Sequence, residues 1–387
     1  MRKFFILLAV GLLCLSCGSN STPAKLVAER VPINNLYYNL YDNRTAEVTR
    51  IPNKKDIVIV DIPESVQNGN TTYRVTAIGE YAFYSCSNMT NVTIPNTVTS
   101  IGEGAFDGCY SLKSIALPDK LTSIGVGAFA KCTGLTRIVI PNTVTSIGNS
   151  AFYSCDGLNY PVYNDRIFAY MPRRCSGAYN IPEGIEHICD GAFFGCKYLT
   201  FVNIPNSVKT IDNDAFFGSG LTKVTIPGSV ANIGESAFRE CKNLSSVTIS
   251  EGVKSIDKEA FRRCYRLYYV SLPNTLKSIG DMAFDDCESL PSITIPNSVN
   301  DIGRMSFSGC TILSSIVIPN GVTAIKHATF NECTNLRSVT IPNSVTTIED
   351  YAFADCASLT TVVIPKSVTS LNDYAFYRSP KVRIIHE

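Results

Sequence analysis

The sequence predicts a mainly β fold: a solenoid of about 13–14 rungs of about 23 residues each, with short helical or 3₁₀ corners. Two observations support this prediction. One pattern recurs at a nearly fixed period, and each copy carries an apolar face that it cannot bury alone. A Phe followed three residues later by Cys or Ser marks the period, and most spacings are 23 residues, with one of 22 and one of 41. The marking residues are Phe83, Phe106, Phe129, Phe152, Phe193, Phe216, Phe238, Phe261, Phe284, Phe307, Phe330, Phe353 and Phe376.

Each copy predicts two extended segments and a corner, as the unit LRSVTIPNSVTTIEDYAFADC at 336–356 illustrates. Val339 and Ile341 alternate with polar residues, which is typical of a strand with one buried face. Pro342 ends this strand, because proline has no N–H to donate to the next ladder bond. The segment 345–348 resumes the apolar pattern and predicts a second, shorter strand. The stretch before the Cys fits a short helical or 3₁₀ corner.

The first residues, 1–17, resemble a lipoprotein-type signal peptide. An apolar run of ten residues, Phe4 to Leu13, is too short to span a bilayer and fits the apolar part of a secretory signal. Cys17 follows Ser16 as in a bacterial lipobox, where the Cys becomes the acylated N-terminus, although Cys14 stands where that motif usually has Leu. The alternative is a signal peptide that is cleaved nearby and leaves an exported protein without a lipid. We expect no transmembrane helix in the mature chain.

The remaining chain divides into a cap and a repeat region. Residues 18–72 predict a linker and an N-terminal β cap, with a hairpin turn at Asp42 and Asn43. Such a cap would cover the core and strand edges that an open solenoid end exposes. Residues 73–387 predict the solenoid, with an irregular repeat at about 157–190 that contains a second expected hairpin. This irregular repeat is either an inserted flap or an altered part of the stack.

The repeat also resembles a known family. The spacing L-x-x-V-x-I, the I-P pair that ends it and the following V-x-x-I-x-x-x-A-F-x-x-C are similar to the BspA-like, or Treponema-type, leucine-rich-repeat proteins. The resemblance runs from about Tyr73 to about Arg378. It implies a leucine-rich-repeat solenoid in an exported or surface protein, since several similar family members are implicated in adhesion to host matrix proteins or to other cells.

Most cysteines occupy one position of the repeat, and we interpret them as a structural ladder. Equivalent residues of stacked rungs should lie about 5 Å apart, which would permit disulfides, but their side chains point the same way instead of toward each other. Ser219 and Ser379 take this position in two repeats, so a small, weakly polar filler satisfies it. Whether Cys175 and Cys189, near the irregular repeat, form a disulfide is left open. The ladder consists of Cys86, Cys109, Cys132, Cys155, Cys196, Cys241, Cys264, Cys287, Cys310, Cys333 and Cys356.

The sequence predicts no enzyme, no metal site and no cofactor. It contains no zinc-type cluster of Cys and His, and no nucleophile, metalloprotease, phosphate-loop or dinucleotide motif. The three histidines, His187, His327 and His386, are far apart in the chain. A formal net charge of +1 gives no indication of a nucleic-acid partner.

The outward positions of the longer strand predict an open surface rich in Ser and Thr. Such a surface lacks an enclosed pocket but suits extended contacts with a protein or glycan. The alternative interpretation is that these residues are simply soluble β-formers. Aromatic and Arg residues interrupt the pattern, and they are typical of interface hot spots. The candidate partner-binding residues are Phe201, Arg262, Arg263, Tyr265, Arg266, Tyr268 and Tyr269.

We therefore expect a non-catalytic, exported cell-envelope lipoprotein that binds a protein or glycan ligand along the solenoid. The expected partners are host matrix or cell-surface proteins, or glycans, and the membrane through a lipid on Cys17. The expected location is the outer membrane, facing the cell surface or the periplasm. The alternative is a periplasmic structural or assembly scaffold. The absence of an acidic residue at 18–22 weakens the surface hypothesis, because an acidic run there resembles a surface-export signal in some similar bacteria.

Overall fold

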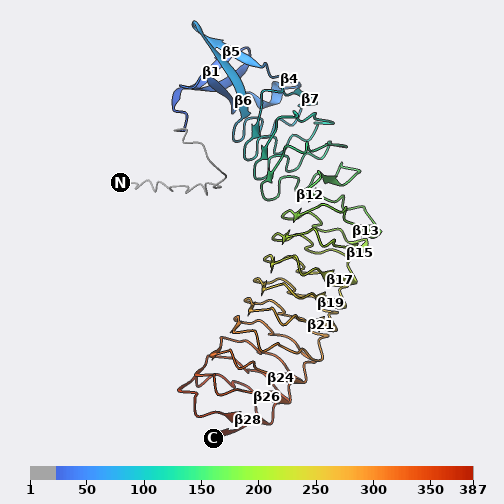
Figure 1. Ribbon diagram of the computed structural model, residues 1–387, viewed down its shortest axis with the longest axis vertical. Coiled ribbons are helices and arrows are strands. Elements are labelled where there is room, and N and C mark those ends of the chain that lie inside the picture. Colours follow the sequence, from blue (N-terminus) through green and yellow to red (C-terminus); the bar gives the residue numbers. More distant parts are fainter. Residues whose placement is uncertain (1–22, 387) are drawn as a thin grey trace.

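The computed structural model describes residues 23–386, so the predicted signal peptide and Cys17 lie outside the described residues. The chain forms an elongated, bowed stack of rungs with the N-terminal strands at one end and the C-terminus at the other (Figure 1). Within the described residues there is one 3₁₀ helix, η1 (Lys54–Asp56), and no α-helix. The prediction of a mainly β solenoid of stacked turns is confirmed.

The N-terminal strands close one end of the stack. Strands β1, β2 and β3 form an antiparallel meander, and the β2–β3 pairing confirms the hairpin expected at Asp42 and Asn43. Strand β3 then pairs in parallel with β6, whose last residues continue into the solenoid. Burial of Tyr38, Leu40 and Val48 covers the core of the first rung. The bounds are β1 Leu26–Ile33, β2 Leu36–Tyr41, β3 Thr45–Thr49, β4 Ile59–Asp61, β5 Ser65–Asn68 and β6 Thr71–Ile78.

Beyond this end, the rungs form two columns of mainly parallel strands, one long and one short, although the segments 112–117, 135–140 and 290–295 follow the path of the long column without forming a strand. The long strands run along the right-hand side of Figure 1. Besides β4, they are β7 Asn91–Thr93, β13 Gly177–Asn180, β15 Leu199–Asn203, β17 Lys223–Ile226, β19 Ser246–Ile249, β21 Tyr269–Ser271, β24 Ser315–Val317, β26 Ser338–Thr340, β28 Thr361–Ile364 and β30 Arg383–His386. The short column contains β8 Ser100–Ile101, β9 Ser123–Ile124, β10 Ser146–Ile147, β11 Val162–Tyr163, β12 Ile167–Tyr170, β14 His187–Ile188, β16 Thr210–Ile211, β18 Asn232–Ile233, β20 Ser255–Ile256, β22 Ser278–Ile279, β23 Asp301–Ile302, β25 Ala324–Ile325, β27 Thr347–Ile348 and β29 Ser370–Leu371.

The corners are series of turns where the sequence suggested short helical or 3₁₀ segments. Hydrogen bonds join residues three apart, from the N–H of Ala82 to Gly79 O and from that of Cys86 to Phe83 O. These bonds are of the 3₁₀ type, but Tyr81 and Ser85 have φ angles of 55° and 58°. Such left-handed residues reverse the chain direction locally and prevent a helix from continuing. The same two positions recur with positive φ in rung after rung.

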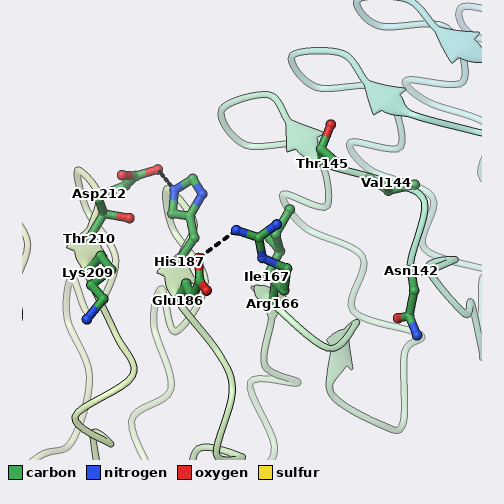
Figure 2. A pocket seen from close by; sticks show the side chains of 10 residues that line it. All are labelled: Asn142, Val144, Thr145, Arg166, Ile167, Glu186, His187, Lys209, Thr210 and Asp212. Atoms are coloured by element: carbon green, nitrogen blue, oxygen red, sulfur yellow. Dashed lines mark hydrogen bonds and ion pairs between the residues drawn. The ribbon is translucent and has the colours of Figure 1, made fainter. Parts of the chain in front are cut away.

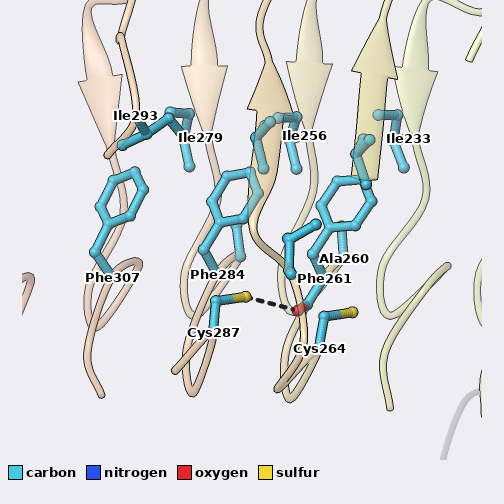
Figure 3. Packing of buried hydrophobic residues seen from close by; sticks show 14 of the residues in the cluster. Ile233, Ile256, Ala260, Phe261, Cys264, Ile279, Phe284, Cys287, Ile293 and Phe307 are labelled. Carbon is cyan, nitrogen blue, oxygen red and sulfur yellow. Dashed lines mark hydrogen bonds between the residues drawn. The ribbon is translucent and has the colours of Figure 1, made fainter. Parts of the chain in front are cut away.

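The core consists of columns of identical residues. Phenyl rings of successive rungs stack nearly parallel, with ring centroids 4.6 Å apart for Phe193–Phe216 and 5.6 Å apart for Phe307–Phe330. The ladder cysteines lie beside this column (Figure 3), and the Sγ of Cys287 donates to Phe261 O at 3.3 Å. Ser379 makes the equivalent bond to Phe353 O at 2.8 Å, so a hydroxyl can replace the thiol. All thirteen described cysteines are free thiols, Cys175 and Cys189 included.

The irregular repeat belongs to the stack, but it interrupts both strand columns. Strand β10 pairs only with β9, and a separate sheet begins with the expected hairpin of β11 and β12. Strand β12 then pairs in parallel with β14. The buried side chains likewise form two clusters, one on either side of this junction. Phe168 takes a place in the phenyl column, 4.8 Å from Phe193, although its backbone aligns with Ile188 in the short-strand column.

Side chains hold the junction together. The backbone N–H and the hydroxyl of Ser150 donate to Asp190 at 3.0 and 2.9 Å. The Nδ2 of Asn142 donates to Asp165 at 2.5 Å, and the hydroxyl of Tyr170 donates to Cys155 O at 3.3 Å. The regular rungs are joined mainly by backbone bonds, so this junction differs from them in kind.

The buried cysteines generate a stability prediction. We expect Cys287→Ser to change the free energy of unfolding by less than about 1 kcal/mol, because the hydroxyl can keep the bond to Phe261 O. Cys287→Leu should cost about 1–3 kcal/mol, since the column has no space for a larger side chain. Urea denaturation of both variants measures this difference. Equal destabilisation by Ser and Leu would show that the position does not act as a small hydrogen-bonding filler.

Candidate functional site

The outer face of the long strands is the candidate site, and its register places side chains in rows. In the five-stranded sheet β13-β15-β17-β19-β21, Ala178, Phe201, Lys223, Ser246 and Tyr269 are successive partners. Alternation of buried and exposed residues along each strand turns all of this row outward. In this row a lysine and a serine separate the two aromatic residues, Phe201 and Tyr269.

Phe201 is 43% exposed and lies beside a surface hollow of about 320 Å³. Ala178, its smaller partner on the preceding strand, leaves one side of the ring uncovered. The hollow is lined by the turn after the strand, including Pro205, and by Pro227 of the next rung. Polar side chains, among them Asn206 and Ser250, also line the hollow, so a ligand there could combine apolar contact with the Phe201 ring and hydrogen bonds.

The two tyrosines form an exposed aromatic pair on the face. Tyr268 and Tyr269 are 64% and 52% exposed, and Arg266 is exposed beside them. Tyr269 lies three strands from Phe201, or about 14 Å at the usual strand spacing. Tyrosines present a large apolar area with a hydroxyl that can still bond to a ligand. Tyr265 is half-exposed on the loop before the strand.

Arg262 and Arg263 lie elsewhere, on the corner, where they join a ladder of ion pairs. Arg262 Nη1 is 3.2 Å from Glu259 Oε2, and its Nε is 2.8 Å from Asp285 Oδ2. Arg263 lies 3.5 Å from both Glu240 and Asp286. Their charges are already balanced by carboxylates of the same and neighbouring rungs. The structure thus brings Tyr268, Tyr269 and Arg266 together as a surface but assigns Arg262 and Arg263 to rung-to-rung contacts.

The ion-pair ladder affects the titration of its carboxylates. Burial alone would raise the pKa of Glu259, but the hydrogen bond from Arg262 and the positive charges of Arg239 and Arg262 lower it below its ordinary value. The pKa of Asp285 is raised, mainly by burial and then by the neighbouring charge of Asp286. Arg262 therefore stabilises the negative charge of two poorly solvated carboxylates, so its role is structural.

A second hollow, of about 430 Å³, lies on the short-strand side where the ladder is interrupted (Figure 2). Asn142 and Thr145 line it from one side of the junction, and Arg166 and His187 from the other. The Nη2 of Arg166 is 2.7 Å from Glu186 Oε2, and His187 Nε2 is 2.6 Å from Asp212 Oδ2. Lys209 also lines the hollow and makes no ion pair within residues 23–386. The His187 ring bonds to Asp212, and among the described residues no hydrogen bond joins that ring to a hydroxyl or thiol that could act as a nucleophile.

The remaining histidines are not gathered into a site. His327 pairs with Asp350 at 3.0 Å, and His386 lies in the exposed strand β30. No group of three or more His, Cys, Asp or Glu within residues 23–386 could hold a metal ion. Burial raises the pKa of the ladder thiols, to about 11 for Cys86 and about 12 for Cys155, so they are poor nucleophiles at neutral pH.

Sequence reasoning missed two features of these surfaces. Lys223 belongs to the exposed row, but only the strand register shows that it separates Phe201 from the tyrosines. The hollow at the junction was missed because its two walls come from segments separated by the irregular repeat. The sequence signal that could have indicated this hollow was the 41-residue spacing between Phe152 and Phe193, since a gap in the period must change the stacking of rungs.

The repeat matches a known family over nearly all of the described chain. The profile of the BspA type leucine rich repeat region (6 copies) matches residues 63–175, 168–273 and 254–383. The chain therefore belongs to the BspA-type leucine-rich-repeat family. No curated relative matches the chain.

Solved structures of bacterial leucine-rich proteins are similar to this chain along almost their whole length. A leucine rich cell surface protein from Faecalibacterium prausnitzii is 31% identical, with 96% of each chain covered and a TM-score of 0.55. A leucine-rich repeat protein from Bacteroides ovatus is 28% identical over 92% of this chain and 99% of that one, with a TM-score of 0.58. One from Eubacterium ventriosum is 25% identical over 89% and 93%, with a TM-score of 0.56.

Membership of this family indicates a non-catalytic, protein-binding or adhesion module, since leucine-rich-repeat proteins are typically binding scaffolds. The geometry is compatible with that class, because Phe201 and Tyr269 are exposed on an open strand face instead of in an enclosed cleft. Within residues 23–386, the structure contains no helix with the length and apolar character needed to cross a membrane.

The corner ion pairs generate a pH-dependent prediction. Arg262→Gln should lower the free energy of unfolding by about 2 kcal/mol at neutral pH, because it leaves the buried Asp285 without an ion pair and removes one of the cations that pair with Glu259. The lowered pKa of Glu259 contributes stability above the ordinary carboxyl pKa, which is lost as pH falls through the lowered value. The deficit of the variant should therefore shrink in acid.

Urea denaturation between neutral and acidic pH measures this effect. Arg266→Gln is the matched control, since Arg266 is exposed, and it should change stability by less than about 0.5 kcal/mol. A deficit in Arg262→Gln that stays constant with pH would contradict the assigned role of the ion pairs.

Proposed function

We propose that the protein is an exported, lipid-anchored binding module of the cell envelope whose long-strand face binds a protein or glycan of the host or of another cell. The observation that carries this proposal is the row of exposed aromatic side chains at Phe201 and Tyr269, with Tyr268 beside it. Aromatic residues that remain exposed on a rigid sheet are typical of interface hot spots.

The rigidity of the face supports the proposal. Strands β15, β17 and β19 have parallel partners on both sides, and β21 pairs with β19 on one side. The inward side chains of these strands share one buried core with the stacked phenyl rings. Ligand binding would therefore cost little conformational entropy, because the protein surface is already ordered. The hydroxyl-rich strands that follow, with Ser314, Ser315 and Ser338 exposed, extend the face with groups that can donate and accept hydrogen bonds.

The proposed location rests on the sequence of the leader and on the similarity to a cell surface protein of Faecalibacterium prausnitzii. Acylation of Cys17 would tether the chain to a membrane through a linker ahead of the N-terminal strands. The long-strand face would then extend along the solenoid, from the end near the membrane to the far end.

Protease treatment of intact cells tests the location. We expect added protease to digest the mature chain on intact cells, as detected with an antibody against the solenoid, because the proposed face must be accessible to an external ligand. A periplasmic marker protein serves as the control for cell integrity. Protection of the chain until the cells are lysed would exclude adhesion and favour the alternative, a periplasmic structural or assembly scaffold.

Substitution of the tyrosines tests the face. The double variant Tyr268→Ser, Tyr269→Ser should bind matrix proteins or glycans on an array at least about tenfold more weakly than the natural protein. Its melting temperature should stay close to that of the natural protein, because both side chains are exposed. Thr360→Ser, Thr361→Ser, at the same two positions of a later rung, is the matched control. Undiminished binding by the folded tyrosine variant would remove these residues from the proposed site.

A further inference from the structure

The repeat of 22 residues, between Phe216 and Phe238, leaves a notch in the surface of the solenoid. In the neighbouring rungs, the two residues 197–198 and 242–243 separate the ladder cysteine from the leucine of the long strand. The short repeat has Gly220 alone at this point. The missing residue leaves a hollow of about 540 Å³ on the loops that lead into the long strands.

Glycines form part of the lining of the notch, and the lack of a side chain matters for a different reason at each of two positions. A Cβ at Gly220 would lie 2.0 Å from the carbonyl oxygen of Lys197, so no other residue fits there. A Cβ at Gly218, which has a φ of 62°, would meet no atom within 4 Å. The notch is therefore open at Gly218 because glycine has no side chain, and a side chain placed there would project into free space.

Two phenyl rings form the apolar part of the lining. Phe194 and Phe217 stack with centroids 4.9 Å apart and ring planes within 6° of each other. The guanidinium group of Arg173 lies over the Phe194 ring at 5.5 Å, and that of Arg239 lies over the Phe217 ring at 5.6 Å. Since the faces contact each other and the two cations, a ligand in the notch meets ring edges. Ring edges carry the positive end of the aromatic quadrupole and attract negatively charged oxygens.

The charged residues of the notch favour an anionic ligand. Lys197 lines it and makes no ion pair within residues 23–386, and Lys242 lies at the other side. Glu240 also lines the notch, but it is 3.5 Å from both Lys242 Nζ and Arg263 Nη1, so two cations balance its charge. Lys223 is exposed on the adjoining strand β17. The local balance is positive although the whole chain is nearly neutral.

We propose that this notch binds a carboxylate side chain of an acidic, extended peptide segment of a partner protein, with an adjacent apolar side chain of that segment on Phe194 and Phe217. This second site goes beyond the proposed long-strand face and uses none of its aromatic residues. A peptide is favoured over a sugar because sugars stack on exposed aromatic faces, and these faces are covered. The notch also opens beside the long strands, so an extended segment can leave it along the sheet.

Fluorescence anisotropy with a short labelled peptide that alternates Glu and Leu tests the proposal, with a Lys-for-Glu version as the charge control. We expect the Glu peptide to bind the full mature chain and the Lys peptide to bind at least about tenfold more weakly. Gly218→Asn, which fills the notch, and Lys197→Glu, which reverses its charge, should each weaken the Glu peptide by a similar factor.

Gly218→Asn should fold normally, because Asn tolerates a left-handed backbone and the equivalent residues Glu240 and Arg263 already adopt it. Gly108→Asn, at the same corner position of a distant rung, is the matched control and should bind the Glu peptide as the natural protein does. The Tyr268→Ser, Tyr269→Ser variant should also keep full peptide binding, so a failure of either proposal can be told from a failure of the other.

Three results would overturn the proposal. One is equal binding of the Glu and Lys peptides, or of neither. Another is unchanged binding of the Glu peptide by folded Gly218→Asn and Lys197→Glu. The third is a clear preference of the notch for an oligosaccharide of glucuronic acid, tested by competition, since this would assign it to acidic glycans instead of peptides.

Discussion

Hydrogen bonds between equivalent backbone positions of successive rungs are the interaction on which the whole structure depends. The N–H of Thr122 donates to Thr99 O, and that of Thr145 donates to Thr122 O in the same way. These bonds fix the register, and the register determines which residues stack. The phenyl column and the cysteine column follow from it, because identical side chains on identical backbones must lie one above the next. A change of one residue in the length of a rung therefore alters the surface locally and leaves the columns intact.

The same constraint decides which charged residues remain available to a ligand. A side chain at a corner position has an equivalent side chain in the next rung within reach, so opposite charges there pair along the stack. Arg262 lies between Glu259 and Asp285 for this reason. Residues on the outer strand face are also in register, but they meet small polar neighbours, as Tyr269 meets Ser246. An aromatic side chain on this face therefore stays exposed when the equivalent residue of the neighbouring rung is small.

The period and alternation of the sequence were sufficient to predict the rungs and their buried columns, because these depend on contacts between repeats of nearly equal sequence. Both hairpins were predicted from the Asn and Asp residues at their turns, which is a local signal. The corners were less predictable. The left-handed conformation of Tyr81 and Ser85 is imposed by the stack and is not the local preference of these residue types. Phe168 was also missed as a member of the phenyl column, since its place depends on a hairpin that shifts the chain. For the candidate site, exposure of Phe201, Tyr268 and Tyr269 followed from their positions after the leucine of each repeat, whereas the pairing of Arg262 and Arg263 required the register between rungs.

The junction between β10 and β12 has a consequence for mechanical load. A tension applied along the axis of a solenoid passes through every rung in series, so each interface between rungs carries the same force. The bonds between rungs lie nearly parallel to this axis, and they separate one after another when pulled. At the junction the backbone ladder is absent, and side chains such as Ser150 and Asp190 carry the load. When tension is applied between its two ends, the protein should extend first at this junction. The junction would then act as a flexible connection between two stiff parts of the solenoid.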